Sequence, residues 1–109
     1  MQSQLQELET TYFTLQSQID TLGVACQTQA QRDALSTQYV KARENYWACV
    51  NKAFHDDDPQ VVKLTDQIHA ANQQIANSVQ QAGDIAKVID DVTNLVTLGT
   101  QLASMVITV

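Results

Sequence analysis

The second half of this chain carries a long seven-residue repeat of apolar positions, and this repeat restricts the fold more than any other feature. The a and d positions of the heptad hold one register from residue 61 to residue 106 and cross Gly83 without a phase slip. Such a repeat is typical of amphipathic helices that pack along a seam. The series comprises Val61, Leu64, Ile68, Ala71, Ile75, Ser78, Ala82, Ile85, Ile89, Val92, Val96, Gly99, Ala103 and Val106.

The first half shows the same pattern with an interruption. A first stretch alternates by three and four residues, through Leu5, Leu8, Tyr12, Leu15, Ile19, Leu22 and Cys26. The pattern fades over residues 27–33 and resumes in the same register at Val40, Trp47, Val50 and Phe54. Between the halves, the run His55-Asp56-Asp57-Asp58-Pro59 predicts a turn. Asp58 can cap the following helix, and Pro59 suits its first turn because the missing N–H costs nothing there.

The two seams predict an all-α fold in a single domain over residues 1–109. We expect one helix over about residues 2–54, a turn at 55–58 and a second helix over about 59–107. These helices would fold back as an antiparallel hairpin roughly 70 Å long, packed by heptads and oligomerising into a bundle. The alternative is a compact three- or four-helix bundle with breaks near Gly23 and Gly83, in which Thr28 and Gln31 form a capping box.

From residue 85 onward the apolar stripe widens to more than half of the helix circumference. One partner helix in a hairpin cannot cover it, so we expect the excess to bind a second copy of the chain or a helical partner protein. The predicted interface consists of Ile85, Val88, Ile89, Val92, Leu95, Val96, Leu98, Leu102, Met105 and Val106. Lipid is the alternative, since residues 92–109 carry no charge and a membrane-active chain would use residues 85–109.

Four aromatic side chains gather toward the central turn, at Tyr39, Tyr46, Trp47 and Phe54. In a hairpin they would face apolar side chains of the second helix and close the tip as a plug, against Val61, Val62, Leu64 and Ile68. An exposed Tyr46 or Trp47 would instead be a secondary anchor for a partner.

The net charge restricts the class of partner, and the first residues indicate the compartment. A net charge of -6 with only six Lys and Arg residues argues against nucleic-acid binding. The first residues contain no basic n-region and no apolar h-region, so we expect a cytoplasmic location, which is compatible with export by a non-classical route. Cys26 and Cys49 are expected to be free thiols, because one continuous helix would hold them about 34 Å apart.

The sequence offers no motif for phosphate, cofactor or nucleophile chemistry. His55 and His69 do not have the spacing of a helical metal site, and the acidic turn lacks the glycine of a calcium loop. Cys49 lies on a different helix face from His55. We therefore predict no catalytic residue, no cofactor-binding residue and no metal ligand, and a chain that is not an enzyme.

A chain of about 100 residues that forms a helical hairpin with Trp47 before the turn is similar in outline to the WXG100 family of secreted bacterial proteins. The family's signature tripeptide has Gly at the position where this chain has Cys49. We predict a non-catalytic interaction, assembly or adaptor protein, of a bacterial secretion or toxin system. The alternatives are a membrane-active helical component and a small acidic immunity or inhibitor protein.

Overall fold

A computed structural model describes residues 4–54, 57–81 and 83–106, and for residue 81 it describes the backbone alone. Four α-helices follow one another: α1 (Gln4–Ala25), α2 (Gln29–Cys49), α3 (Pro59–Ser78) and α4 (Ile85–Ala103), with a short 3₁₀ turn, η1 (Val79–Gln81), after α3. No strand occurs within the described ranges. The all-α prediction is therefore confirmed, and the four helices fit the compact alternative.

The predicted two-helix hairpin is wrong, because each predicted long helix is broken near its middle. At the first break Thr28 caps α2, and its hydroxyl accepts a hydrogen bond from the Gln31 N–H at 3.1 Å. The Gln31 side chain reaches back to the N–H of Thr28 at 3.3 Å, which completes the capping box. At the second break the 3₁₀ turn ends α3, and the Asp84 carboxylate caps α4 by accepting from the Lys87 N–H.

The breaks shorten the molecule and let its helices cover one another. Its principal extents are 43 × 21 × 18 Å, against the roughly 70 Å expected of a hairpin. The predicted helix start after the central turn is confirmed. Asp58 caps α3 by accepting from the Gln60 N–H, and Pro59 is the first residue of α3. The predicted helix end near residue 54 is wrong, because α2 ends at Cys49. Residues 55 and 56 of the acidic turn lie outside the described ranges.

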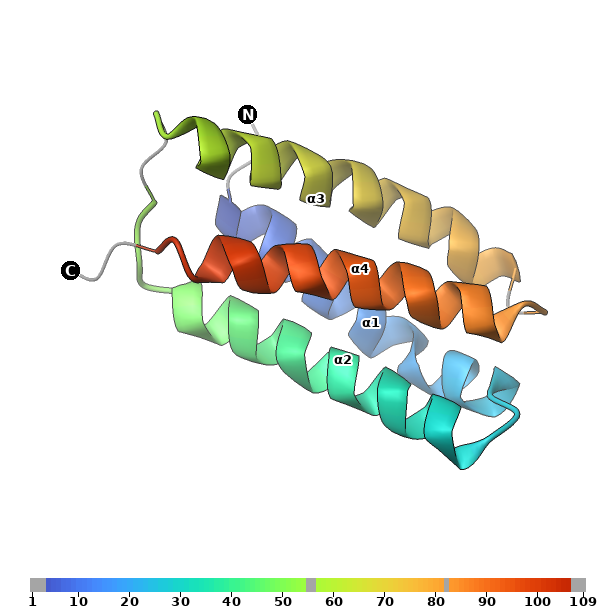
Figure 1. Cartoon of the computed structure of the whole chain (residues 1–109). Helices are drawn as coiled ribbons and strands as arrows, with labels where there is room; N and C mark the ends of the chain where they lie inside the picture. Colours follow the sequence, from blue (N-terminus) through green and yellow to red (C-terminus); the bar gives the residue numbers. More distant parts are fainter. Residues whose placement is uncertain (1–3, 55–56, 82, 107–109) are drawn as a thin grey trace.

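The helices run alternately in opposite directions (Figure 1). Helix α4 packs mainly against α2 and α3, and α1 packs against α2 and less closely against α3. Helices α2 and α3 therefore lie at opposite corners of the bundle. Helix α4 also touches α1 across the bundle, where a Cβ on Gly99 would lie 3.3 Å from the Leu8 side chain.

The core is formed by all four helices, and α4 contributes the largest share of it. Its apolar side chains from Ile85 to Leu102 are enclosed by α1, α2 and α3. The excess apolar face that the hairpin left uncovered is thus covered by the chain itself. This is the physical reason for the breaks: burying a Leu, Ile or Val side chain contributes about 1.5–3 kcal/mol, and Thr28 and Asp84 cap the helix starts that the breaks create.

The described part of the chain contains no helix with the length and hydropathy needed to cross a bilayer.

Candidate protein-binding surface

The interface predicted on the last helix lies inside the bundle. Seven of its members are buried and three are half-buried against the core, so none of the ten is among the exposed large apolar side chains. The buried members are Ile85, Val88, Ile89, Val92, Leu95, Val96 and Leu102, and the half-buried ones are Leu98, Met105 and Val106. A partner would reach the buried seven only if the bundle opened, and the exposed apolar surface lies elsewhere.

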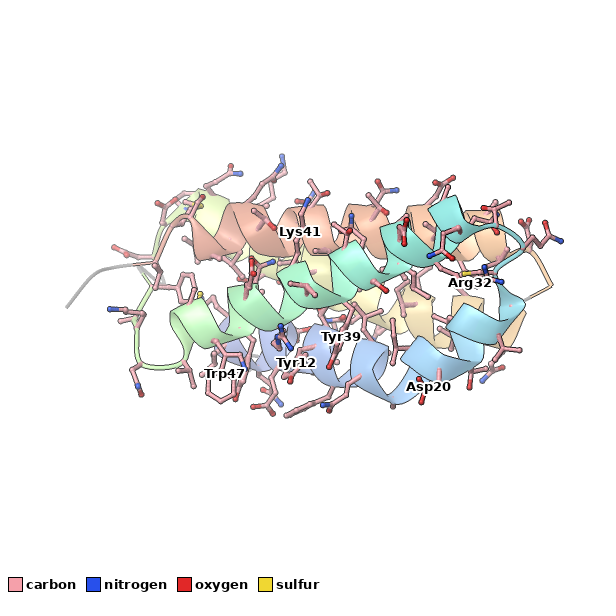
Figure 2. The ribbon with its side chains drawn as sticks, turned by 90° about the horizontal axis from the view of Figure 1, so that it is seen from below. Tyr12, Asp20, Arg32, Tyr39, Lys41 and Trp47 are labelled. Carbon is pink, nitrogen blue, oxygen red and sulfur yellow. The ribbon has the colours of Figure 1, made fainter. Side chains whose placement is uncertain are left out.

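Most of that exposed surface is on α1 and α2, with Phe13, Val24 and Trp47, whereas Val62 lies on α3. Five rings form a continuous set of contacts across the two helices, and we call them the aromatic face: Tyr12, Phe13, Tyr39, Tyr46 and Trp47. Ring centroids of neighbours lie 5.1–6.1 Å apart, within the range of favourable aromatic pairs. Trp47 is 59% exposed and Phe13 is 48% exposed, whereas Tyr12 is buried beneath them. Figure 2 shows Trp47, Tyr12 and Tyr39 along the line where α1 and α2 meet.

The sequence pattern assigned these aromatic residues to the wrong neighbours. The predicted plug against α3 is wrong for Tyr46 and Trp47, because Tyr46 packs against α1 and Trp47 packs edge-on against Tyr46. Helix α2 instead buries Leu35, Ala42 and Cys49, which are also spaced by seven residues. The break at residues 26–28 frees α2 to turn about its axis relative to α1, so the register of the first seam does not continue into it.

A hydrogen bond ties the aromatic face to a charge. The Tyr46 hydroxyl donates to Glu9 Oε2 of α1 at 3.1 Å. Burial against the neighbouring rings, together with this bond to a carboxylate, raises the pKa of the Tyr46 hydroxyl. The Arg43 guanidinium lies 6.0 Å from the centre of the Tyr39 ring, in cation–π range. The prediction that Tyr46 or Trp47 anchors a partner is not tested by these contacts. Trp47 is exposed, as the side chain of an anchor residue has to be.

A shallow groove continues the aromatic face toward the other end of the bundle. It runs between α1 and α2 and is lined by Ile19, Asp20, Gly23, Val24, Arg32, Leu35 and Ser36. Asp20 and Arg32 mark this end in Figure 2. Val24 is 87% exposed at the end of the groove. One face of the molecule therefore combines exposed aromatic side chains, an apolar groove and charges of both signs.

A second polar feature lies on the opposite side of α1, where it meets α3. Glu7 is 2% exposed, and the Asn72 side-chain amide donates to both its carbonyl oxygen and its Oε1, at 3.1 and 3.0 Å. Asn72 Oδ1 in turn accepts from the Thr11 hydroxyl at 2.7 Å. His69 Nδ1 lies 3.1 Å from Glu7 Oε2. We call these four residues the Glu7 cluster, and sequence reasoning missed it.

A signal for this cluster exists in the spacing of α3. Asn72 follows Ile68 by four residues and precedes Ile75 by three, so it shares their buried face. A polar side chain on such a face needs a partner, because an unsatisfied buried amide costs free energy. The partner, Glu7, is 65 residues away and cannot be read from local spacing.

The Glu7 cluster resembles the orienting half of a catalytic triad, in which a carboxylate holds a histidine. In a triad the other ring nitrogen faces a nucleophile. Here His69 Nε2 lies 3.2 Å from the Gln73 side-chain amide, and His69 Nδ1 faces Glu7. The ring nitrogen that would activate a nucleophile is therefore occupied by an amide, and the cluster joins α1 to α3.

The remaining candidates for chemistry do not come together. Cys26 and Cys49 are both buried and free, as predicted. Burial raises the pKa of the Cys49 thiol, which makes it a poor nucleophile. Across the described ranges, no group of three or more histidine, cysteine, aspartate or glutamate residues is placed to hold a metal ion. His55 lies outside those ranges.

Comparisons with protein-family models, with curated proteins and with solved structures gave no match. The likeness in outline to the WXG100 family rested on a helical hairpin, and the chain folds into four helices instead.

Proposed function

We propose that this chain is a non-catalytic helical interaction protein that binds a protein partner through the aromatic face. The observation that carries the proposal is the exposure of Trp47, beside the half-exposed ring of Phe13, on two helices anchored to a shared core. Tryptophan, tyrosine and arginine dominate the binding energy of protein interfaces. Rings held by their neighbours lose little conformational freedom on binding, so more of the contact energy contributes to affinity.

The burial of the side chains favours the aromatic face, rather than α4, as the binding surface. Placing a partner against α4 would require the bundle to give up a buried apolar core, whereas the aromatic face needs no rearrangement of the backbone. The Glu7 cluster supports a non-catalytic role, since the hydrogen bonds of its carboxylate and its ring are used within the bundle. The predicted link to a secretion or toxin system stays a prediction.

Site-specific photo-crosslinking tests the proposal. Trp47 is replaced by p-benzoylphenylalanine in the full chain, expressed in the cells that make it, and irradiation captures whatever protein lies against that position. The matched control carries the same group at Val62, which is 44% exposed on α3 and away from the aromatic face. We expect a discrete protein adduct from position 47 and none from position 62.

The result that refutes the proposal is the absence of any discrete adduct from position 47, or equal adducts from both positions. A parallel variant, Trp47→Ser with Phe13→Ser, should lose binding to a partner identified in this way while keeping its helical circular dichroism. Loss of helicity in that variant would show a folding defect, in which case Trp47→Ser alone provides the comparison.

A further inference from the structure

The charges around the aromatic face are divided between its two helices. Helix α1 contains three carboxylates and no Lys or Arg, whereas α2 contains three of the six Lys and Arg residues of the chain and only two carboxylates. Helix α1 thus has a net charge of -3 and α2 a net charge of +1, and two such surfaces attract when α1 of one copy meets α2 of the other. The aromatic face therefore has the charge pattern of an interface between two identical chains.

Contacts between α1 and α2 show which charged residues lie at the same position along the long axis of the bundle. Near one end Tyr46 is bonded to Glu9, and Arg43 is one turn from Tyr46, about 4.5 Å along α2. Toward the other end Asp20 and Arg32 line the same groove. Each of these two carboxylates of α1 thus has a guanidinium of α2 within about one helical turn along the bundle.

These groups are poorly satisfied in the single chain. Within the described residues, the Asp20 carboxylate has no ion pair and no hydrogen bond. Arg32 makes one long hydrogen bond, at 3.4 Å, to the carbonyl of Cys26. The Arg43 guanidinium lies over the ring of Tyr39 and forms no salt bridge with the described residues. Their charges are available to another molecule.

We propose that the partner on the aromatic face is a second copy of this chain, related by a twofold axis parallel to the helices. This inference rests on the proposed function. The rotation places α1 of each copy over α2 of the other at the same level. Glu9 then faces Arg43 of the second copy, and Asp20 faces Arg32 of the second copy, and symmetry repeats both pairs.

The other twofold axis in the plane of the face, perpendicular to the helices, gives the opposite result. It lays α1 on α1 and α2 on α2, each reversed in direction. Carboxylates then approach carboxylates and guanidinium groups approach guanidinium groups, which is unfavourable at close range. The charges thus select the parallel arrangement.

The dimensions of the face fit a stable dimer. The whole molecule is 43 Å long and 18–21 Å across, so one full side of the bundle offers an area similar to the ~800 Å² per partner of a standard protein interface. In the parallel arrangement Phe13 and Trp47 of each copy lie against the aromatic face of the other, because both rings belong to that face. The exposed apolar rings of both copies are then covered by the second chain.

Sedimentation velocity of the full-length wild-type chain over a range of concentrations is the first test. We expect a species of twice the 12.1 kDa chain mass that dissociates on dilution. Trp47 is the only tryptophan, so its emission should shift to longer wavelength as the dimer dissociates. A wild-type chain that stays monomeric at about 100 µM overturns the inference.

Charge reversal tests the arrangement. Asp20→Arg and Arg32→Asp each place like charges opposite one another in the homodimer, and each should weaken it at least tenfold. An equimolar mixture of the two variants restores opposite charges at both pairs and should form a heterodimer. Lys63→Asp on α3 makes the same change of charge as Arg32→Asp away from the face, and should dimerise like the wild type.

Two results overturn the inference. One is that both single variants dimerise as well as the wild type, and the other is that the folded single variants are monomeric but their mixture is too. The photo-crosslinking experiment separates this inference from the proposed function. An adduct of position 47 with a different protein, together with a monomeric wild type, excludes the second copy and leaves the proposed function standing.

Discussion

Removing the side chain of Asn72 tests the Glu7 cluster most directly. In Asn72→Ala the Glu7 carboxylate loses the amide that donates to Oε1, the Glu7 carbonyl oxygen loses a second donor, and the Thr11 hydroxyl loses one of its two acceptors. Because Glu7 is 2% exposed, water does not replace these bonds without opening the contact between α1 and α3.

The expected cost follows from what remains unpaired. A buried neutral group left without a partner costs about 1–3 kcal/mol, and removing a partner of a buried charge costs about 3–5 kcal/mol. Glu7 keeps His69 at 3.1 Å, so its charge is not wholly uncompensated. We expect Asn72→Ala to lower the free energy of unfolding by about 3–4 kcal/mol, a large part of the 5–15 kcal/mol typical of a domain.

Urea or guanidinium denaturation at pH 7, followed by circular dichroism, measures this loss. The thermal midpoint should fall as well, by about 4 °C for each kcal/mol in a chain of this size. Asn77→Ala is the matched control: Asn77 is exposed on the same helix, and its replacement should change stability by no more than about 0.5 kcal/mol.

A double variant separates the polar network from simple packing. Glu7→Leu with Asn72→Leu removes the buried charge and its partner together, and should be more stable than Asn72→Ala because no buried polar group is left without its bond. The reasoning is refuted if Asn72→Ala costs less than about 1 kcal/mol, or if the double variant is the less stable of the two.

Three further predictions concern titration and thiol chemistry. A hydrogen bond from Lys87 holds the pKa of the Asp91 carboxyl below its ordinary value of 3.8, so the stabilisation it contributes is complete above that value and is lost as pH falls through the lower, folded value. Acid denaturation should therefore begin at higher pH in a Lys87→Met variant, and an unchanged acid limb would contradict this. Because the pKa of Tyr46 is raised, absorbance near 295 nm should show a late step in alkaline titration that Tyr46→Phe removes, and a step that persists would refute the assignment. In a Cys26→Ser variant, Cys49 should react with a thiol reagent at least a hundredfold more slowly when native than in denaturant, since it is fully buried, and equal rates would refute its burial.

Local patterns correctly indicated several parts of the fold. The seam of α3 is buried at Val61, Leu64, Ile68 and Ile75, as its spacing predicts. The start of α3 at Asp58 and Pro59 and the capping box at Thr28 also follow from neighbouring residues alone. These features depend on interactions within one or two helical turns, which the order of residues specifies.

The continuous register across Gly83 was misleading. Buried Ser78 ends α3 and buried Ile85 begins α4, so the seven-residue step is kept although the chain reverses direction between them. A heptad count records the distance along the chain and not the path between two positions. The register therefore could not distinguish one long helix from two that fold back on each other.

The composition, the apolar seams and the helix caps by themselves determined that this chain is all-α and where its helices can begin. Only the tertiary structure decided which helix covers which. The wide apolar stripe of α4 is enclosed by three helices of its own chain, Trp47 is left exposed by the rotation of α2, and Glu7 meets Asn72 across 65 residues. The physical reason is that amphipathicity fixes the apolar side of a helix, whereas the partner for that side is chosen by the total burial of the folded chain.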